Sequence, residues 1–511
     1  MAPPVTRKHR VLIINAYFDP WRESTPTRLF VPRPMAPYFL AGHFDPDHCE
    51  VRVWDEVFHG ALLDTKLFAW PDLVVFTGLT SAFDRARQLS AYVRHAQPKV
   101  VTVIGGHIAR ALPTICAEVF DYVCQGDAEE ITDVIEVVLG PSCARKEAAP
   151  RHDLTAPNLG VGYVETTKYC NFACSFCTLT GEGRPYSSYQ TAQIERQLDA
   201  VGRVHGLLLS DNNFFGNNRR DFERRTRLLG DRVRAGQFSG WGCLVTGDFF
   251  ANPQNLELVA ENGCKAIFSG VETLDPKVLK SYNKKQSLIS HPLSLASACA
   301  KHGILFDYGM MVDFSQQTMA EVAEQIDAIL DNPRMKLPAF VSTTIPIVGT
   351  PYFDQAVAKG RLLPNVLLSD MDGVKLVEKP LEPVEQVAAF YGRLINMRGR
   401  QGALVRHAVR HAWHWRKELP WDLTALSLLM PLQRYRRRRG IGSFAQMITS
   451  WREAAPTYNA GTDAPRRCYT PLFPMPERFA RDFEPLQVTD SRGALTDDFE
   501  QARSRQVGFG T

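Results

Sequence analysis

The sequence predicts an α/β protein with two successive domains of alternating strands and helices, followed by a mainly helical C-terminal region. Short apolar runs typical of buried strands recur through the first 375 residues, and segments with helical periodicity separate them. A polar stretch rich in proline, alanine and charge interrupts this alternation near residue 150. With 511 residues, 45% of them hydrophobic, the chain is long enough for about three domains. We expect these at residues 1–140, 159–375 and 376–511, with a linker at 141–158.

The first domain has the pattern of a Rossmann-like, doubly wound parallel sheet. Strands are expected at 11–15, 51–54, 73–77, 100–104 and 122–124, and helices at 83–95 and 128–138. Ligands of such sheets bind at the carboxyl ends of the strands. The loops there carry glycines, which allow close approach of a bulky ligand, and small polar side chains that can bond it. The candidate binding residues are Thr77, Gly78, Thr80, Ser81, Gly105, Gly106, His107, Gly126 and Glu129.

The G-x-G-x-x-G fingerprint of dinucleotide-binding proteins is absent from this domain, which argues against NAD or FAD. A sheet of this kind that binds no ligand is the alternative.

Residues 159–375 carry six further strand patterns that alternate with helical ones. This predicts a partial (β/α)6 barrel of the TIM type, whose active site lies at the C-terminal strand ends. The strands are expected at 161–165, 207–210, 242–245, 266–270, 305–312 and 340–346. The helices are expected at 191–201, 219–234, 255–262, 276–281, 292–301 and 318–330.

A C-x3-C-x2-C run, formed by Cys170, Cys174 and Cys177, directly follows the first barrel strand. Three thiolates leave one iron of a cubane iron–sulfur cluster open to a substrate or cofactor, whereas four make a closed electron carrier. A zinc site usually needs a fourth Cys or His at ligand spacing, and no second pair of cysteines occurs. A disulfide framework suits a short secreted chain. We therefore interpret the run as a cluster site, with a chance grouping of structural cysteines as the alternative.

This run and its context resemble the radical S-adenosylmethionine (radical SAM) enzymes. In that family the open iron binds the amino and carboxylate groups of SAM, which is then cleaved to a 5′-deoxyadenosyl radical. The resemblance implies that Phe176 contacts the adenine of SAM and that Asp211 lies in an acidic turn below the cluster. It also implies that Ser269 and Glu272 belong to a segment whose carboxylate lies near SAM.

The first domain is similar to the cobalamin-binding domain that precedes many radical SAM domains. The similarity rests on the glycine pair Gly105-Gly106, on Pro113 and on the turn at 126–129, in which Asp127-Ala128 replaces the usual Glu-Gly. The D-x-H-x-x-G motif, which supplies a lower axial histidine in other cobalamin proteins, is missing. The resemblance therefore implies cobalamin without a histidine ligand, and His107 as a loop residue near the nucleotide tail.

Together the two resemblances imply a cobalamin-dependent radical SAM methyltransferase that uses a 4Fe–4S cluster, SAM and cobalamin. It would methylate an unactivated carbon of a hydrophobic or natural-product substrate, because a carbon radical can accept a methyl radical from methylcobalamin but no methyl cation from SAM. One alternative is a cyclase or oxidising enzyme resembling the anaerobic magnesium-protoporphyrin IX monomethyl ester cyclase. Others are a radical SAM enzyme with a vestigial cobalamin domain and a non-catalytic iron–sulfur or corrinoid carrier. The sequence identifies no catalytic acid or base.

The expected partners are a small-molecule substrate, such as a lipid or tetrapyrrole, and an external electron donor such as flavodoxin or ferredoxin. We expect a cytoplasmic protein, because the sequence has no apolar stretch of membrane-spanning length and no signal peptide. Cysteines at low density also fit a reducing compartment.

The region after residue 375 matches no motif, but it contains a strongly basic segment. Residues 400–440 hold ten Lys and Arg against two acids, in a chain of net charge +4. Helical spacing places Leu404, Val405, Ala408, Val409, Ala412 and Trp413 on an apolar face, and Arg406, His407, Arg410, His411 and His414 on the other. Basic amphipathic helices with tryptophan are typical of membrane interfaces, which suggests peripheral contact with the inner membrane.

A solvated basic face on a helical cap over the barrel is the alternative for this segment, and we favour it. Nucleic acid is not an expected partner, because aromatic residues are not interleaved along the basic run at 434–439.

Overall fold

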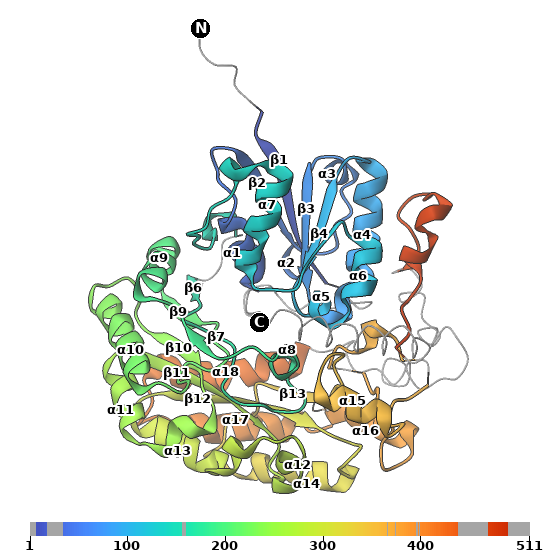
Figure 1. The fold of residues 1–511 in the computed structure, drawn as a ribbon. Helices are drawn as coiled ribbons and strands as arrows, with labels where there is room; N and C mark the ends of the chain where they lie inside the picture. Colours follow the sequence, from blue (N-terminus) through green and yellow to red (C-terminus); the bar gives the residue numbers. More distant parts are fainter. Residues whose placement is uncertain are drawn as a thin grey trace, which may run out of the picture. The chain divides into compact units, whose positions relative to one another are not determined.

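The computed structural model describes residues 7–17, 34–155, 160–437 except 365, 374, 395, 396 and 398, and 469–488. The chain divides into two compact units, whose elements are labelled in Figure 1. Unit 1 comprises Met1–Ala156, Pro364–Asp372 and Arg452–Thr511, and unit 2 comprises Pro157–Leu363 and Gly373–Trp451. The predicted α/β class is confirmed, and the region after residue 375 is shared between the two units.

Unit 1 is built on a parallel sheet with the strand order β2-β1-β3-β4-β5. Its strands are β1 (His9–Ala16), β2 (Cys49–Asp55), β3 (Leu73–Gly78), β4 (Val101–Gly105) and β5 (Tyr122–Cys124). Its α-helices are α1 (Ala36–Gly42), α2 (Glu56–His59), α3 (Thr65–Phe68), α4 (Phe83–Ala96), α5 (His107–Ala111), α6 (Pro113–Val119) and α7 (Ile131–Leu139). Short 3-10 helices are η3 (Thr80–Ala82), η4 (Ala128–Glu130), η5 (Pro141–Cys143), η6 (His152–Leu154), η9 (Leu368–Asp370) and η11 (Glu477–Phe483).

Helices cover both faces of this sheet, with α1 and α7 on one side and α4 on the other (Figure 1). Val11 and Ile13 share a core with Ala41 of α1 and Val134 of α7. Their neighbours Leu12 and Ile14 are equally buried and point to the opposite face, because side chains alternate along a strand. Burial on both faces explains why these strands appear in the sequence as continuous apolar runs.

The segment expected as a linker packs against unit 1 instead. The Cys143 side chain is in the same core as α1 and α7. Backbone hydrogen bonds join Arg145 N–H to the His43 carbonyl at 2.8 Å and Arg151 N–H to the Tyr38 carbonyl at 3.0 Å. The prediction of a linker is therefore wrong for residues 141–155, because bonds between irregular backbones leave no periodic pattern in a sequence.

Residues 469–488 dock on α4 of unit 1. The Tyr469 hydroxyl donates to Asp84 Oδ2 at 2.8 Å, and the Leu472 N–H donates to the Tyr92 hydroxyl at 2.9 Å. Arg87 Nη2 donates to the Glu484 carbonyl at 2.6 Å. This part of the C-terminal region completes the outer layer of unit 1.

Unit 2 contains a six-stranded parallel sheet with the order β13-β12-β11-β10-β9-β6, which confirms the predicted partial barrel. Its strands are β6 (Val161–Val164), β9 (Gly206–Leu209), β10 (Trp241–Leu244), β11 (Cys264–Glu272), β12 (Leu305–Val312) and β13 (Phe340–Thr343). A separate antiparallel pair joins β7 (Thr167–Lys168) to β8 (Ser187–Ser188). The helices are α8 (Thr178–Glu182), α9 (Thr191–Val201), α10 (Arg219–Arg234), α11 (Gln254–Glu261), α12 (Pro276–Ser281), α13 (Pro292–Lys301), α14 (Met319–Asp331), α15 (Pro351–Ala358), α16 (Val384–Leu394), α17 (Gln401–Trp415) and α18 (Trp421–Arg437), with 3-10 turns η7 (Gly247–Ala251) and η8 (Lys285–Leu288).

Helices α17 and α18 pack together at the N-terminal ends of the barrel strands (Figure 1). Trp415, Leu419 and Leu423 share a core with Leu305, the first residue of β12. The Tyr435 hydroxyl donates to the Pro338 carbonyl, just before β13, at 3.0 Å. None of the helices in the described ranges is long and apolar enough to cross a membrane.

The buried face of α17 differs from the predicted apolar face. Val405, Val409 and Trp413 are exposed. The buried residues are Leu404, His407, Ala408, His411, Ala412 and Trp415. The prediction placed His407 and His411 on the polar side, and this placement was wrong.

The two histidines are buried because they bond to carbonyl groups at the end of α14 and in the loop that follows it. Nδ1 of His407 lies 3.0 Å from the Leu330 carbonyl, and Nδ1 of His411 lies 2.9 Å from the Pro333 carbonyl. Since a carbonyl only accepts, each Nδ1 must carry the proton and donate. The pKa of His411 is lowered to about 3, mainly by burial and also by the nearby His407 and Lys336, although the bond to Pro333 opposes this. His411 is therefore neutral in the folded protein.

We predict that His411→Asn reduces the sensitivity of the protein to acid. A depressed pKa in the folded state contributes stability above the unfolded value of about 6.5, and this contribution is lost as the pH falls towards 3. Asparagine keeps a donor near the Nδ1 position and does not titrate. Between pH 7 and pH 5, the free energy of unfolding of wild type should fall by about 2 kcal/mol more than that of the variant.

Thermal unfolding at a series of pH values measures this difference. The matched control is His414→Asn, because His414 is exposed on the same helix, and it should follow wild type at every pH. A difference between His411→Asn and wild type that is independent of pH would contradict the prediction.

Candidate active site

The three cysteines lie at the C-terminal end of the barrel, in the loop that follows β6 and β7. Cys174 is 6% exposed, and Cys170 and Cys177 are half-buried. Cys177 is the residue immediately before α8. The structure thus brings the run to the end of the sheet where βα-barrel enzymes carry out catalysis.

The start of this loop is held by Asp211, which follows β9. One carboxylate oxygen accepts the N–H groups of Thr166 and Thr167 at 2.6 and 2.9 Å. The other accepts the Thr166 hydroxyl at 2.5 Å. Burial raises the pKa of Asp211, and the bonds from Thr166 act in the opposite direction. Asp211 therefore positions the chain that leads to the cysteines, and its predicted proximity to SAM stays a prediction.

A second connection, after α12, holds the middle of the cysteine loop. The Ser175 N–H donates to the Tyr282 carbonyl at 2.9 Å, and the Tyr352 N–H donates to the Ser175 carbonyl at 3.0 Å. The Asn283 side-chain amide donates to the Ala173 carbonyl at 2.8 Å. The loop is therefore held by hydrogen bonds from chain segments after β11 and β13 as well as from β9.

Three residues around this loop adopt a left-handed backbone although none is glycine. The φ angles are 61° for Tyr169, 65° for Glu272 and 54° for Asn283. Such conformations cost on the order of 1–3 kcal/mol each and persist where surrounding contacts fix them, often at functional sites. Here they change the direction of the backbone next to the cysteines and at the end of β11.

The three sulfur atoms are surrounded by hydrogen-bond donors. Backbone N–H groups of Phe172 bond Cys170, and those of Leu179 and Thr180 bond Cys177. The Cys174 sulfur accepts a bond from Gln286 Nε2 at 3.2 Å. Donors of this kind stabilise anionic sulfur, the form that binds metal.

Burial favours the protonated form of the Cys170 and Cys177 thiols. Burial raises the pKa of Cys177 to about 11 and also raises that of Cys170, while Lys284 lowers the latter. Within the described residues, no three His, Cys, Asp or Glu side chains lie close enough to hold one metal ion. Three thiols on one loop, each with an N–H donor, are a donor set that fits an iron–sulfur cluster.

A buried ion pair lies beside the cysteines. Lys284 Nζ is 2.6 Å from Glu272 Oε1, and both side chains are almost completely buried. Burial alone would lower the pKa of Lys284, but the Glu272 carboxylate together with Cys174 and Cys177 outweighs this, so the pKa is raised. Lys284 Nζ also lies 5.6 Å from the centre of the Phe176 ring. The predicted residues Phe176 and Glu272 are therefore brought together next to the cysteines.

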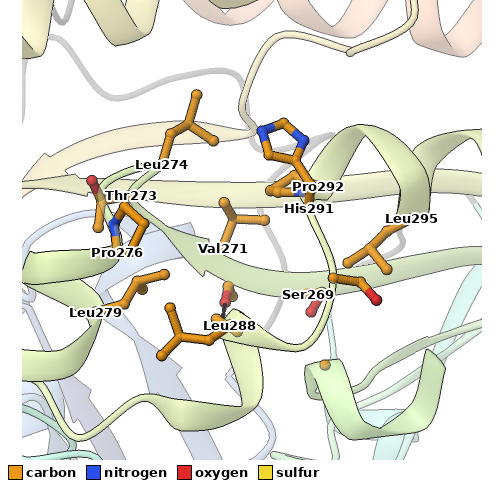
Figure 2. A pocket seen from close by; sticks show the side chains of 14 residues that line it. Ser269, Val271, Thr273, Leu274, Pro276, Leu279, Leu288, His291, Pro292 and Leu295 are labelled. Carbon is orange, nitrogen blue, oxygen red and sulfur yellow. Dashed lines mark hydrogen bonds between the residues drawn. The ribbon is translucent and has the colours of Figure 1, made fainter. Parts of the chain in front are cut away.

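Ser269 lines a small cavity instead of joining this pair. The cavity lies between β11 and the helices α12 and α13 and has a volume of about 170 Å³ (Figure 2). Figure 2 shows apolar side chains such as Val271, Leu279 and Leu295 around it, with His291 at its edge. Ligand sites for molecules of cofactor size usually measure about 300–1,000 Å³, so this cavity is too small for SAM as it stands.

A buried chain of hydroxyl and carboxyl groups lies behind the loop. Asp313 Oδ2 accepts from the Tyr282 and Tyr352 hydroxyls at 2.7 and 3.0 Å, and Glu378 Oε2 lies 2.9 Å from the Tyr352 hydroxyl. Burial and the nearby Asp313 raise the pKa of Glu378 to about 7, although Arg361 and the bond to Tyr352 lower it. Glu378 is therefore partly protonated at neutral pH.

The sequence analysis missed the segment at residues 282–286. It provides Tyr282 and Asn283 to the loop backbone, Lys284 to Glu272, and Gln286 to Cys174. These residues come after α12 and before α13, where the sequence shows no motif. Their only signal is the unusual number of polar residues between two apolar helices.

The candidate cobalamin residues lie at the C-terminal strand ends of unit 1. The strand order 2-1-3-4-5 puts the topological switch point between β1 and β3, where ligands of such sheets bind. A Cβ atom on Gly78 would lie 2.8 Å from the Ala16 carbonyl oxygen, and one on Gly106 would lie 3.9 Å from Thr77 Oγ1. The backbones at the ends of β1 and β3 therefore approach each other closely at Gly78, and the end of β4 lies near them.

The remaining candidate cobalamin residues lie in different local surroundings. Thr80 and Ser81 are buried in η3, just before α4, and Gly105 and His107 flank Gly106. The Glu130 carboxylate occupies the position that a Cβ on Gly126 would take, next to Glu129. Their contact with cobalamin stays a prediction.

Comparison with known proteins agrees with this site. Residues 164–327 match the radical SAM superfamily. The chain is 26% identical over 340 residues to the hopanoid C-2 methylase of Rhodopseudomonas palustris, covering 62% of this chain and 63% of that protein. It is 25% identical over 349 residues to the bacteriochlorophyllide d C-12(1)-methyltransferase of Chlorobaculum tepidum, covering 63% of this chain and 72% of that protein. The chain thus matches less than two thirds of the length of the hopanoid C-2 methylase.

Two solved structures share the fold. The cobalamin-dependent S-adenosylmethionine radical enzyme OxsB gives a TM-score of 0.54 at 12% identity, over 97% of this chain and 84% of that one. The radical SAM methyltransferase TsrM of Kitasatospora setae gives a TM-score of 0.52 at 17% identity, over 70% of this chain and 78% of that one. Residues 164–327 therefore match a radical SAM domain, and the predicted resemblance to cobalamin-dependent radical SAM enzymes is confirmed.

Proposed function

We propose that this protein is a cobalamin-dependent radical SAM methyltransferase that methylates an unactivated carbon of a hydrophobic substrate. The observation that carries the proposal is the loop of Cys170, Cys174 and Cys177, held at the C-terminal barrel end with donors aimed at its sulfur atoms. When bound, the cluster and SAM supply a carbon-centred radical, and cobalamin supplies the methyl group.

In this proposal, the residues of unit 2 bind and orient the cluster and SAM. The three thiolates hold the cluster, and the backbone N–H groups around them stabilise their charge. The pair of Glu272 and Lys284 offers one acceptor and one donor, which match the ammonium and carboxylate groups of an amino acid such as the methionine part of SAM. Phe176 provides an aromatic surface next to this pair.

The substrate class rests on the relatives. Two of the curated relatives are named for the methylation of a hopanoid and of a bacteriochlorophyllide. We therefore favour a lipid or tetrapyrrole. Reductive cleavage of SAM needs one electron, so the proposal includes an external donor such as flavodoxin or ferredoxin and a reducing, cytoplasmic location.

The proposal predicts the product ratio of the reaction. Protein reconstituted anaerobically with iron, sulfide and cobalamin, then given SAM, a reductant and lipid or pigment extracts, should form a product heavier by one methyl group. One 5′-deoxyadenosine and one S-adenosylhomocysteine should appear for each methyl transferred, because one SAM is cleaved and another donates the methyl group. Mass spectrometry measures all three.

The test variant replaces a cysteine of the loop, and its matched control replaces a cysteine elsewhere in unit 2. Cys174→Ala should abolish 5′-deoxyadenosine, whereas Cys299→Ala, in an equally buried position away from the loop, should retain it. Substrate that loses hydrogen without any S-adenosylhomocysteine would instead indicate the cyclase or oxidising enzyme. Absence of SAM cleavage by wild type would indicate a carrier.

We also propose that α17 and α18 contact an anionic membrane surface. Val405, Val409 and Trp413 form a stripe at i, i+4 and i+8 of α17, and Trp413 is 67% exposed. Trp421, at the start of α18, is 84% exposed. Exposed tryptophans of this kind are typical of membrane interfaces.

The charge around the stripe complements anionic headgroups. Arg406 and Arg410 are exposed on α17, and the guanidinium of Arg416 lies 3.8 Å from the centre of the Trp413 ring. Helix α17 has no acidic residue. The basic run at 434–439 falls largely outside the described side chains. Since α17 packs at the N-terminal strand ends, opposite the cysteine loop, this contact would anchor the protein without delivering substrate to the loop.

We predict that Trp413→Ser combined with Trp421→Ser weakens binding to anionic vesicles at least about tenfold, because burying one large apolar side chain contributes about 1.5–3 kcal/mol. Sedimentation with phosphatidylglycerol vesicles measures the binding, which salt should also weaken. Leu381→Ser, at an exposed position outside α17 and α18, is the control and should bind as wild type does. Wild type that stays in solution at low salt would exclude this contact.

A further inference from the structure

Gln286 is the single side chain, among those the structure describes, that donates a hydrogen bond to a cysteine sulfur of the loop. Its Nε2 lies 3.2 Å from the Cys174 sulfur. Gln286 is 3% exposed and Cys174 is 6% exposed, so water does not compete for this bond. The residue belongs to η8, far from Cys174 in sequence.

The other end of the Gln286 carboxamide has no partner in the described part of the chain. Its Oε1 is buried and accepts no hydrogen bond. A buried polar atom without a partner is unfavourable, and an apolar side chain of similar size would pack there at no such cost. The stability of the barrel therefore does not explain a glutamine at this position, whereas a bond to a charged sulfur does.

The backbone of η8 holds Gln286 firmly in place. A Cβ on Gly247 would lie 2.1 Å from the Gln286 carbonyl oxygen, so the loop after β10 packs directly on this backbone. The Ser287 hydroxyl donates to the Gly270 carbonyl at 3.2 Å. The preceding Lys284 is fixed by its ion pair with Glu272. The carboxamide is thus presented to Cys174 by a rigid support.

We propose that Gln286 is a positioning residue that raises the reduction potential of the iron–sulfur cluster by donating a hydrogen bond to Cys174. The inference rests on the proposed cluster. Reduction adds negative charge that is shared with the sulfur ligands, so a donor to one of them favours the reduced state. In the cluster-bound protein the Cys174 sulfur is a thiolate and can only accept, which fixes the amide nitrogen towards it.

A redox titration of the reconstituted protein, followed by electron paramagnetic resonance, tests this role. Gln286→Met has a similar length but no donor. It should reduce the ratio of reduced to oxidised cluster at a fixed potential about tenfold, which corresponds to a potential about 59 mV lower. Gln286→Glu places a carboxylate beside the thiolate and should lower the potential further.

Gln317→Met is the matched control. Gln317 is as deeply buried in the same unit, and its described bond is to the Asp313 backbone rather than to a cysteine. It should keep the potential of wild type. Iron and sulfide analysis shows whether each protein carries its cluster.

The outcomes separate this inference from the proposed function. Wild type that takes up no cluster would contradict the proposed function itself. A wild-type potential in Gln286→Met with a full cluster would overturn only the role of Gln286. Loss of the cluster in both Gln286 variants, with the control intact, would also overturn it, because the residue would then serve assembly.

Discussion

A buried carboxylate holds the loop on which the site depends. Asp211 accepts three hydrogen bonds from Thr166 and Thr167, directly after the first barrel strand. Charge in so buried a position is costly unless donors surround it, and these three bonds offset part of that cost. They join the ends of β6 and β9 and fix the direction in which the chain leaves the sheet. The three cysteines are reached a few residues later, so their placement depends on this contact.

The far side of the loop depends on the connection after α12. Residues 282–286 bond the loop backbone, pair with Glu272 and reach the sulfur of Cys174 within five consecutive positions. Behind them, Asp313 links the hydroxyls of Tyr282 and Tyr352. The cysteine loop therefore lies between two rigid supports, one from the early strands and one from the late strands. A cluster site needs such rigidity because small displacements of its ligands change both affinity and potential.

Much of this arrangement could be predicted from the sequence. Continuous apolar runs such as residues 11–14 identify buried parallel strands, and the alternation with helices identifies the partial barrel. The spacing of Cys170, Cys174 and Cys177, together with its position after the first barrel strand, predicts the cluster chemistry. These features are local in sequence, so a periodicity or a spacing reveals them.

The features that could not be predicted depend on contacts between distant residues. His407 and His411 are polar by type, yet carbonyls some 80 residues earlier in the chain make their burial favourable. Residues 141–155 have the composition of a linker, but backbone bonds and the side chain of Cys143 attach them to unit 1. Gln286 is an ordinary polar residue in the sequence and acquires significance only through its contact with Cys174. Tertiary contacts decide all three cases.

The central claim is that the three-cysteine loop leaves one iron open to SAM. Electron paramagnetic resonance of the reduced, cluster-loaded protein tests this most directly, in spectra recorded before and after addition of SAM. The account predicts a spectrum of a reduced 4Fe–4S cluster whose g values change when SAM binds the open iron. A spectrum that SAM leaves unchanged would contradict the account, because it would show a cluster with every iron already ligated.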